Sequence, residues 1–244
     1  MPATNWRQKM VQNLALAFPD AIFYKPTDIR TIALTIDDVP TPGVLGPCPT
    51  RWILDAIADH NQSVSNPDQV ARATFFIIGN HLNRDNTLLY DLVVQGHEIA
   101  NHGMFDTWAA LQSPKQFRQQ FQTTHERLIE QVPDLVIGWY RPGRALYSPV
   151  MLQVLKETAY NPYFALASML PLDTLAATAE PAFTAQYTLQ HVFPGAILLL
   201  HGGSVERSKN TAQALKLLLP QLTAAGYQVR TLSELWALQE AQQR

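Results

Sequence analysis

The chain has 244 residues, of which 47% are hydrophobic and 16% are charged, a composition typical of a folded protein with a large core and unlike that of disordered or fibrous chains. The formal net charge is −2 and the isoelectric point is near 6.4, so the chain lacks the positive field that attracts nucleic acid or an anionic membrane surface. The single cysteine, Cys48, excludes an internal disulfide and a zinc site built from thiolates. We expect a single domain over residues 1–244.

The amino-terminal segment contains only one short apolar run, from Leu14 to Phe18. This run is too short for the core of a signal peptide and far too short to cross a bilayer. With Met1 as the start of the chain, we expect a cytoplasmic protein that has neither a membrane segment nor a nucleic-acid partner.

Short apolar runs rich in β-branched residues alternate with longer amphipathic segments along the chain. The runs predict buried strands at 31–36, 73–78, 98–100, 135–140, 163–167 and 196–200. The spacing of apolar residues between them predicts helices at 87–94, 116–130, 150–158 and 211–225. This alternation of strand and helix favours an α/β fold with a parallel sheet.

Polar, titratable residues follow most of the predicted strands. In chain order they are Asp37 and Asp38, Asn80 and His81, His102, Arg141, Asp173 and His201. In a barrel of parallel strands, the loops that follow the strands converge on one face. We therefore expect these side chains to gather at the carboxyl ends of the strands and to carry the chemistry.

Asp37 and Asp38 end the first strand, in the stretch LTIDDVPTPG. Adjacent like charges are costly without a compensating partner, and neighbouring residues of a strand point to opposite faces. The two carboxylates are therefore expected to have different roles, one as a metal ligand and the other as a free base. The alternative is a turn in which both carboxylates are solvated caps.

His102 and Asp106 are four residues apart in the stretch GHEIANHGMFDTW, so one helical turn would bring them to the same side. With Asp38 they would supply one imidazole and two carboxylates. This donor set suits a divalent ion such as zinc, manganese, cobalt or iron, with positions left open for water and substrate. His97 lies on the other face of the strand and is expected to be a packing residue.

Two further positions are candidates for the chemistry. Arg141, in WYRPGRALY, stands where a predicted strand ends in a Pro-Gly turn. Its planar guanidinium would lie beside free backbone N–H groups. An ordinary salt bridge in a loop fits the same pattern. His201, in GAILLLHGG, follows a buried strand and precedes two glycines that leave its imidazole open, so it is a candidate proton donor. Trp108 and Tyr147 could stack on a sugar ring or simply pack within the protein.

Together, these motifs resemble the polysaccharide deacetylases with the NodB homology domain, carbohydrate esterase family 4. The matching pieces occur in the family's order over residues 31–203: 35-TIDDVP-40, 73-ATFFIIGNHL-82, 96-GHEIANH-102, 141-RPG-143 and 198-LLLHGG-203. The resemblance implies a distorted (β/α) barrel of about seven parallel strands. It also implies a metal-dependent hydrolase that removes N-acetyl groups from an amino-sugar oligomer or polymer of the chitin or peptidoglycan kind.

The resemblance also implies roles for the site residues. It makes Asp37 the general base, Arg141 the partner of that base and His201 the general acid. Asp38 and His102 take the positions of metal ligands. The implied cofactor is one divalent metal ion, with zinc as the first expectation.

Several positions depart from the family's pattern. Asp106 stands where the family has its second metal histidine, and Val39 replaces a glycine. Arg144 replaces a tyrosine, at the position whose backbone N–H helps to hold the oxyanion. Asp173, in MLPLDT, stands for the aspartate that orients the catalytic histidine, but the usual tryptophan is missing. An oxygen ligand at position 106 favours harder ions than the usual set does, so manganese, cobalt and iron are alternatives to zinc.

Two other functions are compatible with the sequence. A hydrolase of the NodB type that acts on a small non-sugar amide fits the expected absence of a secretion signal, because cell-wall polymers lie outside the cell. A non-catalytic carbohydrate-binding relative fits Asp106 and the weak fourth motif, although the presence of Asp37, Arg141 and His201 together argues for a catalyst. The motifs leave the oligomeric state open.

Overall fold

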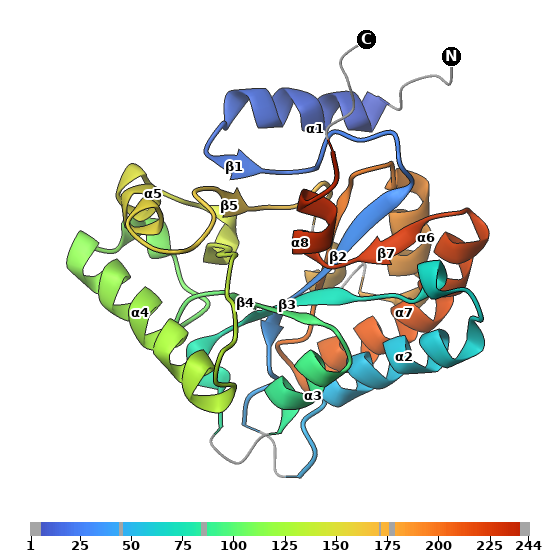
Figure 1. Cartoon of the computed structure of the whole chain (residues 1–244), viewed down its shortest axis with the longest axis horizontal. Coiled ribbons are helices and arrows are strands. Elements are labelled where there is room, and N and C mark those ends of the chain that lie inside the picture. The colour runs from blue at the N-terminus through green and yellow to red at the C-terminus, as the bar shows by residue number, and fades with distance from the viewer. Residues whose placement is uncertain (1–5, 44–45, 84–86, 171, 176–178, 240–244) are drawn as a thin grey trace.

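The computed structural model describes residues 6–43, 46–83, 87–170, 172–175 and 179–239 (Figure 1). Its strands are β1 (Ala21–Ile22), β2 (Thr31–Val39), β3 (Ala73–Ile77), β4 (Glu98–Asn101), β5 (Phe164–Ala165), β6 (Ile197–His201) and β7 (Gln228–Arg230). Its helices are α1 (Trp6–Ala17), α2 (Thr50–Ser63), α3 (Leu88–Val94), α4 (Pro114–Gln131), α5 (Pro149–Lys156), α6 (Pro181–His191), α7 (Val205–Ala224) and α8 (Leu232–Trp236).

The strands form a distorted barrel. Neighbouring strands follow the order β4-β3-β2-β6, β7 also pairs with β2, and β1 pairs with β5, all in parallel. Tyr140 joins the two groups, because it forms parallel bridges to Asn101 at the end of β4 and to Phe164 in β5. The ring returns to β6 where the N–H of Ser168 donates to the carbonyl oxygen of Ile197 at 2.9 Å. The predicted fold class is confirmed.

The predicted strands are present except at 135–140, where Tyr140 forms only single-residue bridges. Asn161 donates to the carbonyl oxygen of Gly138 from both its backbone N–H and its side chain, each at 2.8 Å, and so occupies an acceptor that a neighbouring strand would use. The four predicted helices correspond to α3, α4, α5 and α7. The short strands β1 and β7 and the helices α1, α2, α6 and α8 lay outside the prediction.

Alternate residues of the strands face the inside and the outside of the barrel. The outward residues, such as Leu34, Phe75 and Leu198, belong to the main core under the helices. A second apolar cluster joins α8 to one side chain from each of β1 to β6 and to Trp139: Ile22, Ala33, Phe76, Ala100, Trp139, Ala165, Ile197, Leu232 and Leu235. We assign this cluster to the inside of the barrel, which α8 closes at the amino-terminal ends of the strands.

The longer helices cover the outside of the ring (Figure 1). α2 and α7 pack against each other, as do α6 and α7, and α4 packs against α5. α4 begins with a capping box in which Ser113 and Gln116 satisfy each other's backbone N–H groups, with Pro114 at the first helical position. Across the described part of the chain, every helix is either too short or too polar to cross a bilayer.

Candidate active site

The polar side chains of the site lie on the same inward face of the barrel as the apolar side chains that precede them in the chain. Side chains of a strand repeat with a period of two, so an even step from an inward apolar residue reaches another inward residue. Such steps lead from Ala33 to Asp37, from Ala100 to His102, from Trp139 to Arg141 and from Ile197 to His201. The apolar cluster therefore fills the lower part of the barrel, and the ionisable groups fill its carboxyl end.

Arg141 and Asp37 form a buried ion pair in the centre of this end. Arg141 Nη1 lies 2.6 Å from Asp37 Oδ1, and both side chains are at most 4% exposed. The other donors of the guanidinium bind, in order of distance, the carbonyl oxygen of Ala165, the hydroxyl of Thr35 and the carbonyl oxygen of Leu166. The planar fork is thus bonded on all sides, and it fixes the orientation of the Asp37 carboxylate.

Asp38 does not point away from Asp37, so the expectation that strand alternation separates the two carboxylates is wrong. The register of β2 against β3 shifts between Ile36 and Val39, and Asp38 has a φ of 65°, in the left-handed region. This bulge turns Asp38 into the site. Asp38 Oδ1 lies 3.4 Å and Asp37 Oδ2 lies 3.5 Å from the same atom, His102 Nε2.

The other partners of the two carboxylates differ. Asp37 is bound by Arg141, whereas Asp38 Oδ2 lies 3.5 Å from Nη1 of Arg207, a partly exposed residue in the first turn of α7. Burial would raise the pKa of Asp38, but the hydrogen bond and charge of His102, with the charges of His201 and Arg207, outweigh burial and lower it to about 2. Their partners, and not strand alternation, therefore distinguish the two aspartates.

His102 presents one nitrogen to these carboxylates. Its Nδ1 lies 2.8 Å from the carbonyl oxygen of Arg141, which can only accept, so Nδ1 carries a hydrogen and Nε2 faces Asp37 and Asp38. Burial would lower the pKa of His102, but the two carboxylates outweigh it and raise the pKa to about 9. The space between the imidazole and the carboxylates therefore favours a positive charge.

His201 and Asp173 form a second acid–base pair. His201 Nδ1 lies 3.0 Å from Asp173 Oδ2, which also accepts the backbone N–H of His201 at 2.9 Å. Burial would lower the pKa of His201, but the hydrogen bond and charge of Asp173, with the charges of Asp37 and Asp38, outweigh burial and raise it. Since Asp37 and His201 are partners in the β2–β6 register, a carboxylate and an imidazole stand on neighbouring strands.

Asp106 forms an ion pair with Arg144. The chain from His102 to Trp108 contains no helical turn, so the premise that such a turn brings Asp106 beside His102 is wrong. Asp106 Oδ2 lies 2.9 Å from Arg144 Nη2, and these side chains are 34% and 54% exposed. Among the described residues, no group of three or more His, Cys, Asp or Glu side chains is arranged to hold a metal ion.

Two of the three predicted ligands nevertheless fit a divalent cation. Asp38 Oδ1 and His102 Nε2 are buried, face each other and lie 3.4 Å apart. The carbonyl oxygen of Arg141 fixes the His102 ring from the other side, as the partners of metal-binding histidines usually do. A carboxylate and an imidazole are common ligands of zinc, cobalt, manganese and iron.

The residues predicted to contact substrate lie in different surroundings. Trp108 is 54% exposed, at the start of the short turn Ala109–Leu111. Tyr147 instead stacks on Phe164, with ring centroids 4.5 Å apart, so it packs against the barrel wall. Arg144 lies in the turn Gly143–Ala145 with a φ of 60°.

Two residues without a predicted role, Arg207 and Thr41, and the second glycine after His201 also shape the site. Arg207 binds Asp38, and the hydroxyl of Thr41 donates to the carbonyl oxygen of Gly202 at 2.8 Å, which ties the ends of β2 and β6 together. A Cβ on Gly203 would lie 2.6 Å from the Cβ of Asp38, so glycine permits this close approach. Gly203 had a signal in the sequence, because it follows His201 in the last motif. Arg207 resembles any other polar residue on a helix surface.

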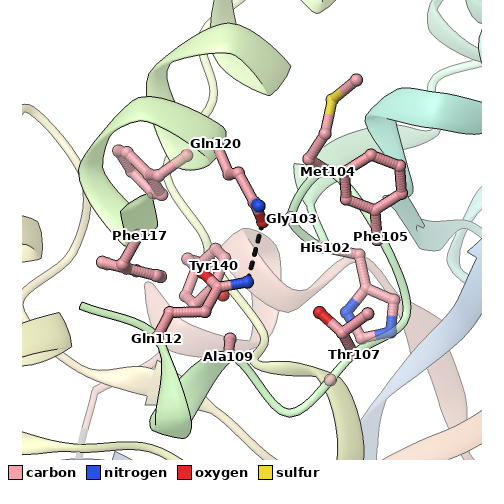
Figure 2. Close-up of a pocket in the computed structure, with 12 residues that line it drawn as sticks. His102, Gly103, Met104, Phe105, Thr107, Ala109, Gln112, Phe117, Gln120 and Tyr140 are labelled. Carbon is pink, nitrogen blue, oxygen red and sulfur yellow. Dashed lines mark hydrogen bonds between the residues drawn. The ribbon is translucent and has the colours of Figure 1, made fainter. Parts of the chain in front are cut away.

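A cavity opens beside His102, beneath the loop that follows β4 (Figure 2). Phe117 and Phe121 of α4 and Tyr140 line the cavity. Gln112 donates to Gln120 at 2.9 Å across the cavity. The imidazole of His102 and the loop that carries Asp106 therefore line the same cavity.

Comparison with known proteins identifies relatives of this chain. Residues 24–163, more than half of it, match the family model described as polysaccharide deacetylase. A peptidoglycan-N-acetylglucosamine deacetylase from Bacillus cereus is 28% identical over 210 residues, which cover 86% of this chain and 90% of that protein. The solved structure of a family 4 acetyl xylan esterase from Clostridium thermocellum, in complex with a cobalt ion, is 26% identical with a TM-score of 0.69 over 84% of this chain and 90% of that one. A CE4 family pseudoenzyme from Bacillus anthracis shares the fold, with 20% identity and a TM-score of 0.72 over 91% of this chain and 71% of that one.

Proposed function

Because this chain belongs to the polysaccharide deacetylase family, we propose that it is a metal-dependent hydrolase that removes N-acetyl groups from an amino-sugar oligomer or polymer of the chitin or peptidoglycan kind. One observation carries the proposal: the buried pair Asp37–Arg141 and the pair His201–Asp173 lie at the same end of the barrel as a carboxylate–imidazole pair that favours a cation. The name of the Bacillus cereus relative supports the substrate class.

Asp38 Oδ1 and His102 Nε2 would hold the cation, which when bound polarises an amide carbonyl and acidifies water. The hydrogen bond from His102 Nδ1 to the carbonyl oxygen of Arg141 keeps the ring in place for this task. Zinc is the first candidate, and cobalt, manganese and iron are the alternatives.

Asp37 acts as the general base in this proposal. Its Oδ1 is bound by Arg141, so Oδ2 is the oxygen that faces the cation pair and takes a proton from the attacking water. Arg141 holds the carboxylate in one orientation, which favours proton transfer from a fixed direction.

His201 acts as the general acid. The Nδ1–H of the ring is held by Asp173, which leaves Nε2 to protonate the departing amine. The backbone N–H of Arg144 would help to hold the oxyanion, an interaction of a class whose loss costs about 3 kcal/mol.

The pH profile tests the pair His201–Asp173. His201 donates only when it is protonated, and its raised pKa keeps it protonated to higher pH. In Asp173→Asn, the pKa of His201 should fall, so the alkaline limb of the kcat/KM profile should move to lower pH. The partly exposed carboxylate of Asp91, which pairs with Arg51, offers a control in Asp91→Asn, whose profile should match the wild type. An unmoved alkaline limb in Asp173→Asn would contradict the role of His201.

Acetate release with and without a chelator tests the cation. Wild-type protein should release acetate from N-acetylated chitooligosaccharides or peptidoglycan, lose activity with a chelator and regain it with zinc or cobalt. Asp38→Asn should lower cobalt affinity by about tenfold or more, measured by calorimetry. Asp59→Asn removes a carboxylate that pairs with Lys216 on the outer surface and should bind cobalt like the wild type.

The same assays separate the alternatives. Activity on small amides without activity on sugars would reject the polymer substrate. Sugar binding without acetate release, in protein loaded with cobalt or zinc, would identify a non-catalytic relative.

A further inference from the structure

Two successive residues near the site have strained backbone conformations. Arg144 and Ala145 have φ values of 60° and 55°, in the left-handed region that residues with a side chain rarely adopt. Such conformations persist only where the surrounding structure holds them. Within the turn itself, the N–H of Ala145 donates to the carbonyl oxygen of Pro142 at 3.2 Å.

The loop that follows His102 holds this turn from outside. Asp106 binds the Arg144 guanidinium at 2.9 Å. Beside this ion pair, a Cβ on Gly143 would lie 2.8 Å from the carbonyl oxygen of Thr107 and 3.3 Å from Asp106 Oδ1. Only glycine allows the two backbones to approach so closely.

The loop is itself fixed to the site. The N–H of Gly103 donates to the side chain of Asn101 at 2.7 Å, and the carbonyl oxygen of Gly103 accepts the N–H of Gly79 at 2.9 Å. His102 and Thr107 line the same cavity as Gly143. The loop therefore runs from His102 to the turn, and hydrogen bonds at Gly103 fix its start.

We propose that Asp106 is a positioning residue, whose ion pair with Arg144 holds the turn that presents the Arg144 N–H, and that Asp106 supplies no ligand to the cation. The role of that N–H rests on the proposed function. The carboxylate binds a guanidinium, and the described residues contain no arrangement of three metal-binding side chains. The ion pair also accounts for two departures from the family's pattern at once, because Asp106 and Arg144 are partners of each other.

Two variants and a matched control test the proposal on the full chain. The variants are Asp106→Asn, which breaks the ion pair, and the double variant Asp106→Arg/Arg144→Asp, which reverses it. The control is Glu157→Gln, which removes an exposed carboxylate that pairs with Arg118. Each protein is measured for cobalt affinity by calorimetry, for hydrogen exchange of residues 142–147, and for kcat and KM.

In Asp106→Asn, we expect the dissociation constant for cobalt to change by no more than about threefold, because only a partly exposed charge is lost. Exchange in 142–147 should become faster. kcat should fall by about tenfold or more while KM changes less, because a misplaced donor acts on the transition state. The double variant should still bind cobalt and should recover slow exchange and part of kcat.

Two outcomes would overturn the proposal. A loss of cobalt affinity of about tenfold or more in Asp106→Asn, or failure of the double variant to bind cobalt, would make Asp106 a ligand. Unchanged exchange in Asp106→Asn would show that the ion pair does not hold the turn. A wild-type protein that binds cobalt but releases no acetate would overturn the proposed function alone, since affinity and exchange still decide the role of Asp106. If the wild type also failed to bind cobalt, the cation site of the proposed function would be rejected, and the exchange of residues 142–147 would still decide whether Asp106 holds the turn.

Discussion

Asp37→Asn is expected to lower kcat for acetate release by about 10²–10⁴-fold and to leave the cation bound. The substitution removes the base, because an amide cannot take the proton of the attacking water. It keeps an oxygen that can accept the hydrogen bond from Arg141 Nη1, now at 2.6 Å from Asp37 Oδ1, so the buried guanidinium retains a partner.

Measurement of kcat and cobalt affinity in parallel checks this prediction. Asp38→Asn provides the contrast. Asp38 has no part in the proposed proton transfer, so this variant should lose cobalt affinity, whereas Asp37→Asn should lose kcat and keep the cation. Both aspartates lie within 3.5 Å of His102 Nε2, so distance alone does not assign their roles. Equal loss of cobalt in the two variants would refute the division between base and ligand.

Arg141→Met should cost about 3–5 kcal/mol of unfolding free energy, the largest stability loss that we expect at the site. The guanidinium is almost fully buried, and its loss would leave the buried Asp37 carboxylate without its nearest counter-charge. The carbonyl oxygens of Ala165 and Leu166 and the hydroxyl of Thr35 would also lose a donor. The apolar methionine cannot replace these bonds.

Urea unfolding of the protein without added metal measures this cost. Arg118→Met is the matched control: its ion pair with Glu157 is exposed on both sides, and such pairs contribute about 0–1 kcal/mol. Arg141→Lys should fall between the two, because lysine keeps the charge but not the planar fork. A loss in Arg141→Met no greater than in the control would refute the structural role of the ion pair.

Much of the site could be predicted because it follows from local rules. Apolar runs with β-branched residues identified β2, β3, β4 and β6, and the period of two carries each inward row to its polar end. Asp37, His102 and His201 therefore stand where a parallel barrel puts the ends of its strands. The short elements β1 and β7 escaped prediction, because a strand of two or three residues is specified by its neighbours more than by its own sequence.

The sequence by itself determined the fold class, the residue types at the carboxyl ends of the strands and the family to which the chain belongs. The tertiary structure decided how these residues are combined. The bulge that turns Asp38 toward His102 arises from pairing between strands. The partners of Asp38 and Asp106, which are Arg207 and Arg144, come from segments distant in the chain. The periodicity of one strand or helix predicts the direction of a side chain. Contacts between distant segments depend on the closed barrel, so the pattern of one segment cannot predict them.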